Sequence, residues 1–274
     1  MNASNDEFTR FEHEGWQRVA EKYDSVWAQS TRQFVPHLLE AAEVTGGMSV
    51  LDVGAGPGYV SAAVAQRGAV PIGLDFSAQM VSIAQKMYPS IEFREGDAQN
   101  LPFVDASFDC VVANFALLHL ADPERACAEA CRVLKPGGKF AFTVWAEAAD
   151  NPYAQLIDDA IKAHADLNVK LPSGPPYYLY KTKAEFREAM ERAGFDGASM
   201  TYAIHRIEWI VPTPGFPFEA ELNAGVRTAG FLAAQTPERL SAIRSAIEEN
   251  VKRYAKGDRF ALPKSAYVIA VAKR

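Results

Sequence analysis

The segment VLDVGAGPG, from Val50 to Gly58, constrains the fold of this chain more than any other segment. A short apolar run, Val50–Val53, ends directly in three glycines spaced two apart, and a helix-forming stretch follows from Tyr59 to Arg67. Glycines allow the backbone to turn sharply and to approach a ligand that a Cβ atom would obstruct. The segment therefore predicts a buried strand, a tight turn and a helix, with a nucleotide-like ligand at the turn.

Strands and helices continue to alternate after this turn. Apolar runs predict further strands at 70–74, 91–94, 108–115 and 139–145, with helices at 78–88, capped by Ser77, and at 123–134, capped by Asp122. Strands that alternate with helices at this spacing need right-handed crossovers and a sheet covered on both faces. The fold expected is α/β, Rossmann-like and doubly wound.

The alternation loosens beyond Trp145. Helices are predicted from Asn151 to Leu167, from Thr182 to Gly194, at 219–234 and at 237–254, with a loop rich in Pro and Tyr at 171–180. Strands are predicted at 200–211 and 266–272, which brings the sheet to seven mostly parallel strands. The added helices are expected to be insertions near the C-terminal strands.

Composition excludes several classes of protein. With 49% hydrophobic and 23% charged residues the chain can bury a substantial core, and its formal charge of −6, without a dense Lys or Arg run, disfavours nucleic acid as a partner. The polar, acidic start and the absence of ~18 uninterrupted apolar residues predict a cytoplasmic protein with no membrane partner. Cys110, Cys127 and Cys131 form no CxxC pair and are expected in the core, without a metal.

An acidic residue follows the glycine turn at the distance that nucleotide-binding folds use. Asp75 ends the second predicted strand, about twenty residues beyond Gly54, where such folds place a carboxylate on ribose hydroxyls. Asp52 precedes the turn and has two open interpretations, a ligand contact or a turn-stabilising side chain. Dinucleotide enzymes show GxGxxG, whose third glycine would fall at Tyr59, so the GxGxG spacing disfavours NAD.

Four segments in order resemble motifs of the class I S-adenosylmethionine-dependent methyltransferases. They are VLDVGAGPG, GDAQNLPF (96–103), FDCVVANFALLHL (108–120) and LKPGGKFAFTVW (134–145). The chain looks similar to the small-molecule branch that includes the ubiquinone and menaquinone C-methyltransferases. The resemblance implies S-adenosylmethionine as cofactor, with S-adenosylhomocysteine as product.

The resemblance also assigns cofactor contacts. It places Asp52 near the cofactor's ammonium group, Asp97 on the adenine amino group and the Ala98 amide on the adenine ring, while Phe76 and Met80 could flank the adenine or belong to the core. The residues assigned to the cofactor are Asp52, Gly54, Ala55, Gly56, Gly58, Asp75, Phe76, Met80, Asp97, Ala98, Asn114 and Phe115.

Methyl transfer needs alignment more than it needs a dedicated base. If a base is used, His119 is the candidate, because it follows the fourth strand at the carboxyl edge of the sheet; the alternative is a structural or pocket-lining His. The segment after this strand begins NFAL and lacks the [DN]PP[YF] signature of enzymes that methylate amino groups of nucleic acid bases. No carboxylate cluster resembles a magnesium site, so metal-independent chemistry is expected.

The N-terminal helix, with Trp16, Tyr23 and Trp27, resembles a lid over the cofactor, although the same rings could pack it on the sheet edge. Tyr177 and Tyr178 are further candidates for the acceptor pocket; the alternatives are an oligomer surface, as in a homodimer, or the core. The chain is expected to divide into a helical lid (1–45), a cofactor-binding core (46–146) and a remainder that completes the sheet and the substrate pocket (147–274), within one compact domain.

These observations predict a methyltransferase that acts by in-line displacement on a small, fairly apolar metabolite, either quinone-like or a natural-product intermediate. Two alternatives stay open: an NAD(P)-dependent reductase, which shares the strand, turn and acidic residue, and a non-catalytic protein that binds S-adenosylmethionine.

Overall fold

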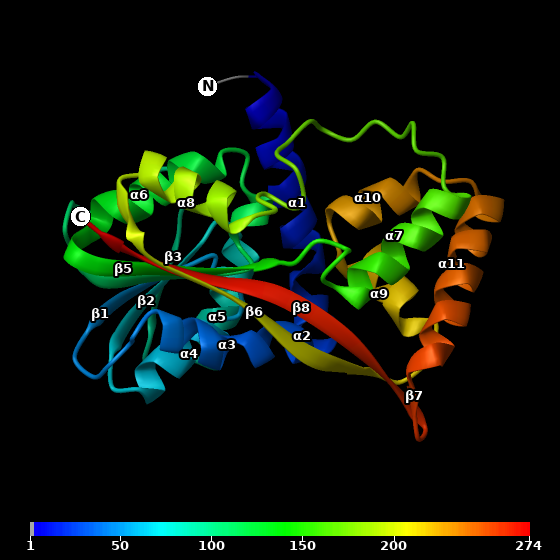
Figure 1. Ribbon diagram of the computed structural model, residues 1–274, viewed down its shortest axis with the longest axis horizontal. Helices are drawn as coiled ribbons and strands as arrows, with labels where there is room; N and C mark the ends of the chain where they lie inside the picture. The colour runs from blue at the N-terminus through cyan, green and yellow to red at the C-terminus, as the bar shows by residue number, and fades with distance from the viewer. Residues whose placement is uncertain (1–2) are drawn as a thin grey trace.

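A twisted central sheet organises the computed structural model, which describes residues 3–274 (Figure 1). Its strands lie in the order β3-β2-β1-β4-β5-β8-β6, and the short β7 pairs with β8. The first five strands pair in parallel, whereas β8 runs antiparallel to both β5 and β6. The strands are β1 (Ser49–Val53), β2 (Val70–Asp75), β3 (Glu92–Glu95), β4 (Phe108–Asn114), β5 (Leu134–Trp145), β6 (Phe195–Val211), β7 (Ala255–Lys256) and β8 (Arg259–Lys273). The predicted seven strands are confirmed, and β7 is an unpredicted eighth.

Eleven α-helices are found in the described part of the chain. They are α1 (Ala3–Val26), α2 (Ala28–Thr31), α3 (Val35–Ala41), α4 (Tyr59–Gln66), α5 (Ala78–Met87), α6 (Pro123–Val133), α7 (Pro152–His164), α8 (Lys183–Arg192), α9 (Phe216–Ala224), α10 (Arg227–Ala233) and α11 (Pro237–Val251). The predicted caps are present, because Ser77 accepts a hydrogen bond from the Met80 amide and Asp122 accepts one from the Arg125 amide. None of the helices within residues 3–274 combines the length and apolar character needed to cross a membrane.

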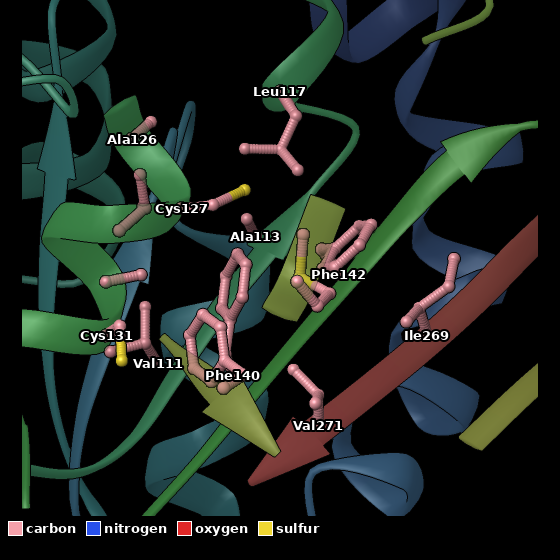
Figure 2. Close-up of a cluster of buried hydrophobic side chains, with 14 of the residues drawn as sticks. Val111, Ala113, Leu117, Ala126, Cys127, Cys131, Phe140, Phe142, Ile269 and Val271 are labelled. Atoms are coloured by element: carbon pink, nitrogen blue, oxygen red, sulfur yellow. The ribbon is translucent and has the colours of Figure 1, made fainter. Parts of the chain in front are cut away.

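Alternate residues of the central strands build two core layers, one on each face of the sheet. Val111, Phe140 and Phe142 pack with α6 and α8 on one face (Figure 2), whereas Val112 packs with α3 and α4 on the other. Figure 1 shows the same arrangement, with α6 and α8 above the sheet and α3 and α4 below it. The prediction that the three cysteines lie in the core is confirmed: Cys127 and Cys131 belong to the first layer, and Cys110 to the second.

Strands β6 and β8 are longer than predicted and extend beyond the sheet as a two-stranded ribbon (Figure 1). The ribbon carries a second helical layer, in which Trp209 and Leu262 pack against α7, α9, α10 and α11. The sequence predicted the last strand only from Ala266, because Pro263, Lys264 and Ser265 interrupt the apolar run. The structure corrects this start to Arg259.

Three further boundaries differ from the predictions. The single helix expected at 219–234 is two helices, since Gly225 adopts an extended conformation between α9 and α10. Helix α7 ends at His164, so Leu167 lies outside it and is 60% exposed. The strand expected at 139–145 begins earlier, because β5 starts at Leu134. The first two residues of the expected lid, 1–45, lie outside the described residues.

Candidate active site

A cavity of about 550 Å³ lies at the carboxyl ends of β1, β2 and β4. Helix α1 passes over this edge between the sheet and the helices α7, α9 and α10 (Figure 1). One side of the cavity is formed by the glycine turn and the residues that follow β2, β3 and β4. The other side is formed by aromatic and apolar residues of α1, α7, α10 and the loop at 171–180. Ligands of parallel α/β sheets bind at this edge.

Gly56 and Asp75 form the polar centre of the first side. The Gly56 amide donates a hydrogen bond to Asp75 Oδ2 (2.8 Å), and the Ser77 amide donates to Asp75 Oδ1 (2.9 Å). Burial raises the pKa of Asp75, although both backbone bonds oppose the rise. Each carboxylate oxygen keeps a further lone pair, so the group can accept the two hydroxyls of a ribose.

The three motif glycines have different reasons to lack a side chain. A Cβ atom on Gly56 (φ +52°) would meet no protein atom within 4 Å, because this residue faces the cavity. A Cβ on Gly54 would collide with Ala116, and one on Gly58 would lie 2.7 Å from the Phe93 ring. Gly56 is therefore the glycine that leaves room for a ligand, whereas Gly54 and Gly58 leave room for the protein's own packing. Gly54 still contributes backbone to the cavity wall.

Asp52 lies behind the turn and not on the cavity wall. Its Oδ2 accepts hydrogen bonds from the Ser61 amide (2.9 Å) and the Ser61 hydroxyl (2.6 Å), while Oδ1 is buried without a partner. Burial is the main reason that the pKa of Asp52 rises to about 7. Ala55, another residue assigned to the cofactor, is also behind the turn, where it packs with Val81 and Phe93.

The candidates for the adenine side divide between the wall and the rim. Phe76, Met80 and Ala98 line the cavity, and Met80 is buried. Asp97 is exposed beside Ala98, and its carboxylate accepts hydrogen bonds from the backbone and side-chain nitrogens of Gln99. An apolar slot with an exposed carboxylate at its edge suits an adenine, whose faces are apolar and whose edge carries an amino group.

Asn114 and Phe115 also line the cavity, at the end of β4. Thr143 holds both residues, since its hydroxyl donates to Asn114 Oδ1 (2.6 Å) and accepts from the Phe115 amide (2.9 Å). Phe115 has a φ of +58°, which is rare for a residue with a side chain, and it stacks on Trp145 at a centroid distance of 3.9 Å. Backbone strain of this kind is found at functional sites.

His119 lies in the short 3₁₀ turn Leu117–His119 and lines the same cavity. Its Nδ1 is 3.0 Å from Oε2 of Glu12, a fully buried residue of α1. When Glu12 is a carboxylate it only accepts hydrogen bonds, so Nδ1 is the donor of this contact, and in the neutral imidazole that leaves the lone pair on Nε2. The Trp16 indole also donates to Glu12 Oε2 (3.2 Å), and Arg227 Nε lies 3.7 Å from Oε1. No motif in the sequence predicted a role for Glu12.

Aromatic side chains predicted for the acceptor pocket come together on the second side. Trp16, Tyr23, Trp27, Tyr177 and Tyr178 all line the cavity. Tyr23 bonds to the Thr31 hydroxyl (3.0 Å), and burial raises its pKa to about 12, so it stays protonated at neutral pH. This side of the cavity is therefore lined by aromatic rings, and the Tyr23 hydroxyl is held in place by its hydrogen bond to Thr31.

Helix α1 is fastened to the cofactor side of the site. Gln17 Oε1 accepts hydrogen bonds from the Ser77 hydroxyl (2.8 Å) and the Gln79 amide (3.0 Å) at the start of α5. The Tyr59 hydroxyl donates to Asp24 of α1. The two interpretations of α1, a lid or a helix packed at the sheet edge, are thus compatible, because the helix packs at this edge and lines the cavity.

Within the described residues, the side chains at this site do not form a set of metal ligands. Across residues 3–274, no group of three or more His, Cys, Asp or Glu side chains lies close enough together to hold a metal ion.

The fold and the cavity define a Rossmann-like protein that binds a nucleoside-containing ligand at the carboxyl edge of its sheet. Residues 51–142 match the family model of the methyltransferase domain. A demethylmenaquinone methyltransferase of Renibacterium salmoninarum is 35% identical over 170 residues, which cover 59% of this chain and 70% of the relative. One of Clavibacter sepedonicus is 33% identical over 232 residues, covering 78% and 84%.

Solved structures share the fold. The YcgJ protein from Bacillus aligns with 88% of this chain and 98% of its own length (TM-score 0.58, 18% identity). A phosphoethanolamine N-methyltransferase of Haemonchus contortus, in complex with S-adenosylhomocysteine, aligns with 97% of this chain and 60% of its own (TM-score 0.56, 19% identity). The chain belongs to the class I S-adenosylmethionine-dependent methyltransferases.

S-adenosylmethionine is the cofactor, and the site fits it. The cradle at Gly56, which a Cβ atom would fill, suits the part of the cofactor that passes this glycine. The carboxylate of Asp75 suits the ribose, and the apolar slot of Phe76 and Met80 suits the adenine. The membership of the methyltransferase family favours this cofactor over a nicotinamide, the alternative that the sequence left open.

Proposed function

We propose that this methyltransferase acts on a small, flat and largely apolar acceptor with an ionisable hydroxyl, of the quinol type. One observation carries the proposal. A single cavity joins the Gly56–Asp75 cradle to a wall of aromatic rings, and His119 lies on that wall with its Nδ1 held by Glu12. The relatives from Renibacterium and Clavibacter are named for demethylmenaquinone, an acceptor of this shape.

The residues divide the work of the reaction. Asp75, Gly56 and the slot of Phe76 and Met80 would hold the cofactor, whose sulfonium supplies an electrophilic methyl group when it is bound. The rings of Trp16 and Phe115 would orient the acceptor and exclude water.

His119 Nε2 would accept the acceptor's hydroxyl proton, and the charge that forms on the imidazole would be stabilised by the Glu12 carboxylate. An acceptor that loses this proton becomes a better nucleophile at oxygen or at the adjacent ring carbon.

A single chain supplies both sides of the cavity. The net charge of −6 and the apolar acceptor wall support a small molecule, rather than nucleic acid, as substrate, and fit an enzyme of the cytoplasm. We further propose that 1–45, 46–146 and 147–274 act as lid, cofactor core and acceptor unit.

The test is an anaerobic assay with S-adenosylmethionine and a reduced, short-chain 2-prenyl-1,4-naphthoquinone, read as S-adenosylhomocysteine formed. The wild type should turn over. Asp75→Asn should bind the cofactor about 100-fold more weakly, and His119→Gln should keep binding but lose about 10²-fold or more in kcat. Cofactor binding without turnover of the quinol would refute the acceptor class and leave the cofactor assignment intact.

A further inference from the structure

Lys264 is a buried cation on the acceptor side of the cavity. It lies on β8, is 2% exposed and contributes to the cavity wall. Within the described residues, its recorded hydrogen bond is a long one, 3.4 Å from Nζ to Ser30 Oγ. An ammonium has three N–H donors, so this contact leaves Lys264 with unused donors at a cavity.

Four aromatic rings surround the Lys264 amine, and we call them the aromatic cage. Nζ lies 4.1 Å from the ring centroid of Trp145, 4.6 Å from that of Tyr153, and 4.8 Å from those of Trp27 and Trp209. Rings at these distances attract a cation through their negative faces, but they accept no ordinary hydrogen bond. The cage therefore fixes the position of the amine without satisfying its donors.

Glu221 of α9 is the acidic side chain whose charge acts on this amine. It also lines the cavity, and Tyr153 donates a hydrogen bond to its Oε1 (2.7 Å). Burial lowers the pKa of Lys264 to about 7, which the charge of Glu221 opposes, and burial raises the pKa of Glu221. Two buried charged groups stabilise a protein no better than apolar residues of the same size. Their place on a cavity wall indicates a role in binding.

Lys264 is connected to the cofactor side of the cavity through two aromatic rings. Phe115 at the end of β4 stacks on Trp145, and Trp145 is the ring closest to the Lys264 amine. Two stacked rings therefore connect the edge of the glycine-turn site to this amine. A flat acceptor that lies along these two rings would have one end near Lys264.

We propose that Lys264 is the specificity-determining residue of the acceptor site: its amine donates a hydrogen bond to an oxygen on the acceptor's aromatic ring, and the aromatic cage orients the amine for this contact. The ligand class is an aromatic ring that carries a hydroxyl, oxyanion or carbonyl oxygen. This inference rests on the proposed function, because it places the acceptor in the cavity described above. Glu221 acts as a positioning residue that holds Tyr153 and balances the charge.

The test measures binding of two probes that differ by one oxygen, 1-naphthol and naphthalene, by equilibrium dialysis with saturating S-adenosylhomocysteine. The wild type should bind 1-naphthol about 10- to 100-fold more tightly than naphthalene, the range expected for a hydrogen bond with a charged or strongly polar donor. Lys264→Met keeps an unbranched side chain in the aromatic cage but removes the donor. It should bind both probes with the affinity that the wild type has for naphthalene.

Two controls make the result specific. Lys162→Met makes the same replacement at a lysine of α7 that is 65% exposed, and it should retain the preference for 1-naphthol. If Lys264→Met fails to fold with Glu221 left unpaired, the double variant Lys264→Met/Glu221→Gln removes both charges and is measured instead. S-adenosylhomocysteine affinity should be unchanged in every variant.

The inference is overturned if the wild type shows no preference for 1-naphthol, or if the preference survives removal of the amine. A loss of stability or of S-adenosylhomocysteine binding without a change in the preference would make Lys264 a structural residue and would also overturn it. Since the assay needs no methyl transfer, a failure of the quinol assay described above is recognised separately.

Discussion

Replacing Gly56 by Ala tests whether this glycine leaves room for the cofactor. The chain offers a matched control, Gly137, that distinguishes a clash with the ligand from backbone strain. Gly56 (φ +52°) and Gly137 (φ +75°) both adopt left-handed conformations, and a Cβ atom at either position would meet no protein atom within 4 Å. Gly56 faces the cavity, whereas Gly137 lies in β5 away from it. The left-handed conformation costs an L-residue about 1–2 kcal/mol. Alanine also lowers the conformational entropy of the unfolded chain, which offsets about half of this cost. Each variant should therefore lose about 1 kcal/mol, or about 2–4 °C in Tm.

The ligand distinguishes the two variants. A methyl group forced into a well-packed contact costs about 2 kcal/mol, which corresponds to an increase of about 30-fold in Kd for S-adenosylhomocysteine. At a ligand concentration of about 100 times the wild-type Kd, the wild type and Gly137→Ala should gain about 2.7 kcal/mol of stability, but Gly56→Ala only about 0.9 kcal/mol.

Thermal unfolding with and without S-adenosylhomocysteine measures these gains, and calorimetric titration gives Kd directly. A full ligand-induced rise in Tm for Gly56→Ala would show that the cofactor does not approach this glycine. An equal loss of the rise in Gly137→Ala would assign the effect to strain alone. Either result would refute the assignment of the turn as the cofactor cradle.

Three further predictions follow from contacts in the same site. Asp75→Asn places an NH₂ group against one of two backbone N–H donors and should weaken S-adenosylhomocysteine binding about 100-fold, measured by calorimetry. Glu12→Gln keeps a hydrogen-bond acceptor for His119 but removes the negative charge of the carboxylate, so kcat should fall about tenfold or more while the cofactor Kd stays constant. An equal change in kcat and in Kd would contradict the role of Glu12 in stabilising the charged imidazole. For Asp52, burial raises the folded pKa to about 7 from 3.8, so its contribution to stability is present below pH 4 and is lost as the pH rises to 7. Urea titration at each pH gives the free energy of unfolding. Between pH 4 and 7 this free energy should fall by up to about 4 kcal/mol more in the wild type than in Asp52→Asn. Parallel plots of the free energy of unfolding against pH for the two proteins would disprove the raised pKa.

Local signals allowed the cofactor side of the fold to be predicted. The strand, glycine turn and helix lie within one short segment, and the caps Ser77 and Asp122 precede their helices directly, so neighbouring residues determine these structures. The parallel order of the first five strands follows from the handedness of their connections. Asp75 could be placed at the end of β2 because it directly follows the second apolar run, about twenty residues beyond Gly54.

Glu12 and Lys264 could not be predicted, because their surroundings are formed by distant parts of the chain. Glu12 meets His119 across 107 residues, and nothing near Glu12 distinguishes it from an ordinary surface acid of a helix. Lys264 follows a proline and interrupts the apolar run of β8, a pattern that favours a loop. Its burial depends on Trp27, Trp145 and Trp209, which come from three separate segments.

The ribbon formed by β6 and β8 has a consequence for how enzymes of this architecture diversify. The inner halves of these two strands belong to the sheet that supports the cofactor side, and their outer halves, which form the ribbon, carry the helices that surround the acceptor side. The family model ends at residue 142, before any of these helices begins. Changes in helix sequence or length at the outer half therefore leave the pairing of β8 with β5 in place. Substrate preference can drift in this region over evolution while the shared cofactor chemistry stays under separate selection.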